Sequence, residues 1–150
     1  MLLFKGKTYA EVLTTIHAQC FTKPWKEDQF TSLLDLPSTF GFIDEKGFIL
    51  CSDLGQDIEI LTLAVLPEFR RKGLASALLN FVQKLMKIQN KKSLFLEVNC
   101  TNEAAIALYK KNGFQPNGTR KNYYHENGAT FDALCFIWQN PSDLIDEQES

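Results

Sequence analysis

The 150-residue sequence contains no long apolar run, and it is not rich in proline, glycine or cysteine. No stretch approaches the roughly 18 apolar residues that cross a bilayer. The apolar start, Met1–Phe4, is too short for a signal peptide, so we expect a cytoplasmic protein without membrane contact. Five prolines, eight glycines and an apolar content of 45% exclude collagen-like, coiled-coil and disordered chains and predict a globular protein.

Cysteine is also scarce, and its spacing carries no motif. Cys20, Cys51, Cys100 and Cys135 lie far apart, without a CxxC pair or a paired histidine. This spacing favours buried free thiols over a metal or redox site. We therefore expect no metal.

Charge is distributed unevenly although the net charge is only −2. Residues 70–121 carry eleven lysines or arginines against two glutamates, whereas residues 27–68 carry nine acids against one lysine. The basic third could serve an anionic ligand, or it could be a set of solvated helix faces.

Hydrophobic periodicity and turn residues predict an α+β protein with helices packed on a sheet. Helices are expected over 8–20, 27–35, 73–89 and 102–111, and strands over 39–43, 48–52, 58–66, 93–98, 114–124 and 130–138. The strand over 58–66 is nearly continuously apolar, which predicts burial on both faces. Residues 1–140 would form the domain, and the acidic residues 141–150 a disordered tail.

The helix over 73–89 has a clear apolar stripe, and the helix over 102–111 has clear ends. Leu74, Leu78, Phe81, Leu85 and Ile88 recur at helical spacing, so we expect them to face the core, with Gln83 on the polar face. Asn102 is a predicted N-cap, and Asn112-Gly113 is a predicted left-handed stop.

A cationic turn joins the strand over 58–66 to the helix over 73–89. The unpaired amides at a helix start carry partial positive charge. Gly73 and Ala75 are small, and Arg70–Lys72 adds three cations. Neither a P-loop nor a GxGxxG fingerprint is present. We interpret the segment as a pyrophosphate cradle, the alternative being a basic helix start in which Gly73 is incidental.

Together with further motifs in the right order, this turn resembles the GNAT family of N-acetyltransferases. The family signature, Arg or Gln-x-x-Gly-x-Gly or Ala after an apolar-Ala-Val triplet, is matched by Arg70, Gly73 and Ala75 after Leu63-Ala64-Val65. The later matches are Leu96-Glu97-Val98, Asn102, Ala107-Leu108-Tyr109 and Gly113-Phe114. Phe21–Trp25 and Asn122-Tyr123-Tyr124 are most similar to the RimI type, the alanine N-acetyltransferases of a small-subunit ribosomal protein.

The resemblance implies a fold and a cofactor site. It implies a mostly antiparallel, twisted sheet of six to seven strands flanked by four helices, with acetyl-CoA in the splay between two parallel central strands. The backbone of Leu63, Ala64 and Val65 would pair with the pantetheine arm, although the side chains of Leu63 and Val65 could equally be core. The remaining implied cofactor residues are Arg70, Arg71, Lys72, Gly73, Leu74, Ala75, Ser76 and Asn102.

Two residues match the catalytic positions of the family. Glu97 matches the general base and is the only acid in an apolar strand, where it could also simply face solvent. Tyr109 matches the general acid, and without the resemblance it would be read as a core tyrosine. His17 is expected to be a satisfied histidine, and Cys100 a bystander.

The implied activity is direct acetyl transfer from acetyl-CoA to a protein N-terminal α-amine, most closely the N-terminal alanine of a ribosomal protein. Asn99, where the family usually has Arg, and Phe131 both depart from the pattern near the acceptor side. They leave open a lysine or small-molecule amine as acceptor. A non-catalytic acyl-CoA sensor or an RNA-binding module is a further alternative. We expect no direct nucleic-acid contact and a monomer or weak dimer.

Overall fold

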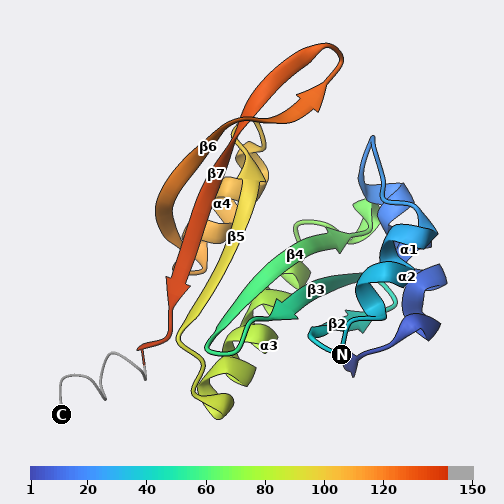
Figure 1. Cartoon of the computed structure of the whole chain (residues 1–150), viewed down its shortest axis with the longest axis vertical. Helices are drawn as coiled ribbons and strands as arrows, with labels where there is room; N and C mark the ends of the chain where they lie inside the picture. The colour runs from blue at the N-terminus through green and yellow to red at the C-terminus, as the bar shows by residue number, and fades with distance from the viewer. Residues whose placement is uncertain (142–150) are drawn as a thin grey trace.

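Seven strands form one mixed sheet in the order β1-β2-β3-β4-β5-β7-β6 (Figure 1). This computed structural model describes residues 1–141. The strands are β1 (Leu2–Phe4), β2 (Thr39–Asp44), β3 (Gly47–Asp53), β4 (Asp57–Val65), β5 (Ser93–Asn99), β6 (Gln115–Glu126) and β7 (Ala129–Gln139). The α-helices are α1 (Ala10–Cys20), α2 (Glu27–Leu34), α3 (Leu74–Gln89) and α4 (Glu103–Lys111). The predicted α+β fold, with a mostly antiparallel sheet and four helices, is confirmed.

The sheet buries both of its faces because its central strands are apolar at odd and even positions. In β3, Phe48 and Leu50 pack into a core with α1 and α2, whereas Ile49 and Cys51 pack into a second core with α3. Alternate residues of a strand point to opposite faces, so one apolar run supplies both cores. α1 and α2 therefore cover one face and α3 the other.

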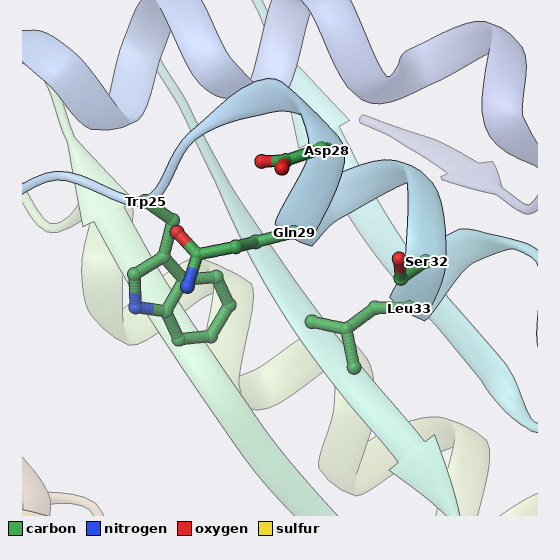
Figure 2. Close-up of a pocket in the computed structure, with 5 residues that line it drawn as sticks. All are labelled: Trp25, Asp28, Gln29, Ser32 and Leu33. Carbon is green, nitrogen blue, oxygen red and sulfur yellow. The ribbon is translucent and has the colours of Figure 1, made fainter.

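α2 packs against the sheet through its inner side and leaves a hollow on its outer side. Phe30 is fully buried and contacts the rings of Trp25 and Phe48. The outer side of the helix and the preceding loop form an open hollow of about 400 Å³ (Figure 2). We call it the α2 hollow; it is lined by Trp25, Asp28, Gln29, Ser32 and Leu33.

Local sequence sets several element ends as predicted. The Oδ1 of Asn102 accepts a hydrogen bond from the backbone N–H of Ala105 (3.1 Å), which caps α4. Gly113 follows α4 with a φ of 89°, which glycine adopts without steric cost. Asn127 and Gly128 both have positive φ at the β6–β7 turn, as a tight hairpin turn requires.

Two predictions about burial are wrong in detail, and one strand was not predicted. In α3 the buried residues are Leu78, Leu79, Val82, Gln83 and Met86, while Ile88 is 80% exposed. Because α3 carries apolar residues on more than one stripe, its position on the sheet determines which stripe is buried, and this is the stripe next to the predicted one. β4 is only half-buried at Leu61 and Leu63. β1 was not predicted, because a strand of three residues is too short to show an alternating hydrophobic pattern.

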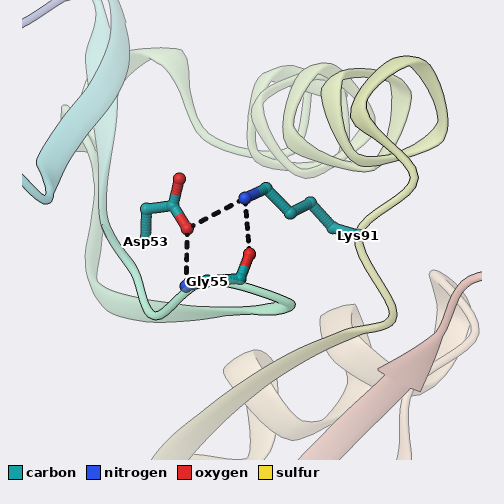
Figure 3. Close-up of polar contacts among 3 residues, drawn as sticks. All are labelled: Asp53, Gly55 and Lys91. Carbon is teal, nitrogen blue, oxygen red and sulfur yellow. Dashed lines mark hydrogen bonds and ion pairs between the residues drawn. The ribbon is translucent and has the colours of Figure 1, made fainter.

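β4 and β5 are parallel neighbours that pair only at one end. Their register covers Asp57–Glu59 against Ser93–Phe95. A polar clamp lies beside this closed end, where the Nζ of Lys91 contacts Asp53 Oδ1 at 3.1 Å and also the carbonyl oxygen of Gly55 (Figure 3). The clamp ties the β3–β4 turn to the segment that leads into β5.

Within residues 1–141, no helix combines the length and apolar character needed to cross a membrane. The predicted tail, except for its first residue Pro141, lies outside the described residues. The expected cytoplasmic location stays a prediction.

Candidate active site

The divergence of β4 and β5 opens a cleft in the middle of the sheet. Beyond Glu59 the two strands have no register with each other. A bulge adds to the divergence, because Ile60 pairs with Cys51 and Thr62 with Leu50, which leaves Leu61 unpaired. The cleft measures about 420 Å³, and its walls include Leu63, Glu97, Asn99, Asn102, Tyr109 and Tyr124. The edge of β4 that faces the cleft thus lacks a partner strand in the described part of the chain.

The cationic turn lies between the end of β4 and the start of α3. Arg71 has a φ of 64° and Gly73 a φ of 81°, so the chain reverses just before α3 begins. The first helical bond is donated by Ala77 N to Gly73 O, and no side chain of the described residues caps the helix. The amides of Leu74, Ala75 and Ser76 therefore stay available for an external acceptor. A Cβ added at Gly73 would meet no atom within 4 Å, so a ligand can approach the backbone there.

The three cations of this turn are not equivalent. Arg70 folds back, and its Nε donates to the carbonyl oxygen of Val65 at 2.9 Å. Arg71 and Lys72 are exposed and have no ion pair among residues 1–141. Arg70 therefore shapes the turn, whereas Arg71 and Lys72 are the cations free to meet a phosphate group.

The other predicted cofactor residues have mixed surroundings. Leu63 and Val65 pack into the α3 core and Ala64 into the opposite core, so the side chains of this triplet are structural. Ser76 Oγ accepts from Asn112 Nδ2 at 3.1 Å, which joins α3 to the end of α4. Of this group only Leu63 and Asn102 line the cleft itself.

Glu97 and Tyr109, the predicted base and acid, face the same cleft from different elements. The side chain of Glu97 is 26% exposed and forms an ion pair with Arg120 of β6, whose Nη1 lies 3.0 Å from Oε1. Tyr109 is only 7% exposed, and burial raises the pKa of its hydroxyl above its usual value. Within residues 1–141 this hydroxyl has no hydrogen-bond partner, so it can donate to a group in the cleft.

Sequence reasoning missed the charged and phenolic neighbours of Glu97. Arg120 shares the sheet face of Glu97, across β7. Glu59 lies on that face too; burial, and secondly the charge of Glu97, raises the pKa of its carboxyl. Tyr124 lines the cleft, and burial together with Glu97 raises its pKa to about 12. Period-2 alternation could have placed each residue on a face, but the strand order was needed to bring them together.

His17 and Trp25 close the cleft on the α1 side. His17 Nδ1 accepts from the backbone N–H of Trp25 (3.1 Å), so in the neutral ring Nε2–H donates to Thr62 Oγ1 (3.2 Å). Burial lowers the pKa of His17 to about 4, which keeps it neutral near pH 7. The expectation of a satisfied histidine is confirmed. Opposite, Lys23 Nζ donates to the carbonyl oxygen of His125 (3.2 Å), so the α1–α2 loop touches the β6–β7 hairpin.

The two departures from the family pattern, Asn99 and Phe131, lie in the wall of the cleft and beside it, respectively. Asn99 lines the cleft, and its Oδ1 accepts from both the backbone N–H and the hydroxyl of Thr101. Phe131 lies beside Tyr124 in the β6–β7 register. Asn99 therefore serves a local turn instead of presenting a cation.

The cysteines are free, as predicted, but only Cys51 is buried; the others are half-buried. Residues 1–141 contain no group of three or more His, Cys, Asp or Glu side chains placed to hold a metal.

Comparison with known proteins gives a consistent result. The model of the acetyltransferase (GNAT) family matches residues 10–114. The bS18-alanine N-acetyltransferase of Escherichia coli (strain K12) is 30% identical over 115 residues, which cover 74% of this chain and 78% of that protein. A Bacillus subtilis (strain 168) protein, whose name only proposes the same activity, is 39% identical over 129 residues, 82% of this chain and 83% of that protein.

The solved structures agree with these sequence relatives. The crystal structure of the ribosomal-protein-S18-alanine N-acetyltransferase of Escherichia coli has a TM-score of 0.83 and 26% identity, and covers 92% of each chain. The chain belongs to the GNAT family of acetyltransferases.

Proposed function

We propose that this enzyme transfers the acetyl group of acetyl-CoA to the N-terminal α-amine of a protein that begins with alanine. By analogy with the named relatives, the acceptor is a small-subunit ribosomal protein. The observation that carries the proposal is that Glu97 and the Tyr109 hydroxyl face one cleft beside an edge of β4, and that within residues 1–141 this hydroxyl has no hydrogen-bond partner and this edge no partner strand. In this proposal residues 1–140 form the catalytic domain.

The residues of the cleft and the turn fit acetyl-CoA. The free amides of Leu74, Ala75 and Ser76, with Arg71 and Lys72, would hold the diphosphate. The unpaired edge of β4 at Leu63–Val65 offers backbone groups to the amide-containing arm, and Asn102 lies on the wall of the same cleft. When bound, acetyl-CoA supplies the activated acetyl group as a thioester.

Glu97 is suited to deprotonate an α-amine through water. An α-amine with a pKa of about 7.7–8.0 is roughly 10–20% neutral at pH 7, whereas a lysine near 10.4 is about 0.04% neutral. This difference is worth about 3.5 kcal/mol, so a carboxylate is a sufficient base for a protein N-terminus and a weak one for lysine. The partly exposed position of Glu97 allows water to reach it.

Tyr109 would stabilise the leaving sulfur by a hydrogen bond. Its raised pKa keeps the hydroxyl protonated at pH 7, so it is a donor. Full proton transfer to a thiolate with a pKa of about 8.5 would be uphill. The hydroxyl therefore donates to the thiolate, and solvent supplies the proton afterwards. The amine attacks the thioester directly, without a covalent enzyme intermediate.

A thiol-release assay against peptides that differ only in their first residue tests this proposal. We expect turnover with an N-terminal alanine and little with a blocked N-terminus. Glu97→Gln should lower kcat about 100-fold and leave acetyl-CoA affinity within about twofold. The matched control, Glu45→Gln, removes an exposed acid outside the cleft and should change neither. Turnover confined to polyamines or lysine side chains would replace the acceptor, and unchanged kcat in Glu97→Gln would exclude Glu97 as the base.

A further inference from the structure

We propose that the α2 hollow binds a lysine or arginine side chain of the acceptor polypeptide, a few residues after its reacting N-terminus. This inference rests on the proposed function, because it needs a polypeptide acceptor in the cleft. The hollow would be a second specificity site, outside the reacting centre, that recognises a cationic side chain.

The α2 hollow lies next to the cleft. Trp25 lines both of them, so its side chain is the shared wall. A peptide whose first residue lies in the cleft therefore passes Trp25 and reaches the outer side of α2. An extended chain advances about 3.3 Å per residue, so six residues span about 20 Å. The test below therefore varies positions three to six, which an extended chain places about 10–20 Å from the reacting amine.

Trp25 is held in place before any peptide binds. Its backbone N–H donates to His17 Nδ1, and its ring lies 5.2 Å from the His17 ring and 5.3 Å from the Phe30 ring. Both partners are buried. Figure 2 shows the indole at one end of the hollow, with Gln29 beside it and Leu33 further along the helix. A fixed wall lowers the entropy lost on binding.

The lining chemistry suits a long cationic side chain. Trp25 and Leu33 offer apolar surface for an aliphatic stem, and an indole attracts a nearby cation. Asp28 is the one acid that lines the hollow, and it has no ion pair among residues 1–141. The nearest basic neighbour in sequence is Lys26, whose backbone N–H bonds Gln29 Oε1. An anionic side chain would instead meet the carboxylate of Asp28.

Asp28 can be tested against an adjacent control on the same helix. Glu27 and Asp28 both lie in the first turn of α2, but only Asp28 lines the hollow. The substrates are an Ala-Gly-(Ser)n peptide and versions with one arginine or one glutamate at positions three to six. For at least one position we expect arginine to raise kcat/KM about three- to tenfold over serine. Glutamate at that position should lower it.

The variants then assign the effect. Asp28→Asn should remove most of the arginine preference, measured as the ratio of kcat/KM for the arginine and serine peptides and expressed through KM, and Asp28→Lys should reverse it toward glutamate. Glu27→Gln should keep the preference within about twofold. Equal kcat/KM for all peptides, or an arginine preference that survives Asp28→Lys, would overturn the inference and leave the proposed function standing. Failure to acetylate any peptide would overturn both. Urea unfolding of each variant separates binding effects from misfolding.

Discussion

The stability of the protein should fall steeply between pH 6.5 and pH 4 because of one histidine. His17 is 3% exposed and lies among the rings of Phe21, Trp25, Phe30 and Phe48, with Thr62 at its Nε2. No carboxylate forms an ion pair with it in the described residues. Protonation would place a charge among these rings and would remove the acceptor for the Trp25 amide. Burial accordingly lowers its pKa from 6.5 to about 4.

The sign follows from comparing the folded and unfolded states. Above pH 6.5 His17 is neutral in both the folded and the unfolded state, so its ring contacts stabilise the fold fully. Between pH 6.5 and 4 the unfolded chain binds a proton that the folded protein refuses, so stability falls as the pH is lowered. Each unit of pKa difference is worth about 1.4 kcal/mol, so the total loss is about 3 kcal/mol. Domains of this size are stable by about 5–15 kcal/mol, so the loss is readily measured.

The assay is urea unfolding at pH 7, 6, 5 and 4 for the natural sequence and for His17→Asn. Asparagine does not titrate, and its Oδ1 can accept from the Trp25 amide. The variant should be less stable at pH 7, because it loses the ring contacts, but the difference should shrink by about 3 kcal/mol at pH 4. The carboxylates titrate in both proteins alike, so their contribution cancels in the difference between the two free energies of unfolding. A difference that stays constant with pH, or an NMR titration of His17 near pH 6.5, would refute the reasoning.

Three substitutions test other parts of the molecule. Tyr109→Phe should change stability by less than about 0.5 kcal/mol, because the hydroxyl has no partner among residues 1–141, yet lower kcat about 100-fold in the thiol-release assay. Lys91→Met should cost about 1 kcal/mol in urea unfolding by releasing the clamp on Asp53 and Gly55. Gly41→Ala should cost about 2–3 kcal/mol in the same measurement, because its Cβ would collide with the Ile49 carbonyl oxygen and lie 2.7 Å from the Phe4 ring. Normal kcat in the first, or unchanged unfolding in the other two, would contradict these assignments.

Features with a local cause could be predicted from the sequence. The start of α4 at Asn102 follows from a side-chain oxygen three residues before a free amide, and its end follows from the left-handed conformation of Gly113. The β6–β7 turn follows from Asn127-Gly128, which accepts positive φ at both positions. In each case the residues that decide the geometry lie within three positions of one another in the chain.

Features that depend on packing could not be predicted in detail. α3 has two overlapping apolar stripes, and only contact with the sheet decided that Leu79 and Val82 would be buried while Ile88 would not. Gln83 looked like a surface residue, but its Nε2 donates to the carbonyl oxygen of Asn112 across the α3–α4 contact. A polar residue can occupy a buried position where it finds such a partner.

The same division holds for the candidate site. Glu97 and Tyr109 were predicted through family resemblance, and the structure places them on the same cleft. Arg120 was not predicted, because it is 23 residues from Glu97 and meets it only across β7. The Nη1 of Arg120 lies 3.0 Å from one oxygen of the Glu97 carboxylate and 3.2 Å from the other. This ion pair could not be predicted from the sequence, because the prediction requires knowing that β7 lies between β5 and β6.

The cleft itself depends on a balance between pairing and divergence that no single segment encodes. At the closed end, three residue pairs and the Lys91 clamp hold the β3–β4 turn and β5 together. At the open end, β4 carries the bulge at Leu61, and the half-buried Leu61 and Leu63 pack against the cores and also line the cleft. A strand apolar enough to be buried on both faces therefore ends with an unpaired edge. That edge is tolerable because backbone groups in a water-filled or ligand-filled cleft still find partners. The apolar run in β4 predicted burial correctly at Ile58, Ile60, Ala64 and Val65, whereas Leu61 and Leu63 at the cleft are only half-buried.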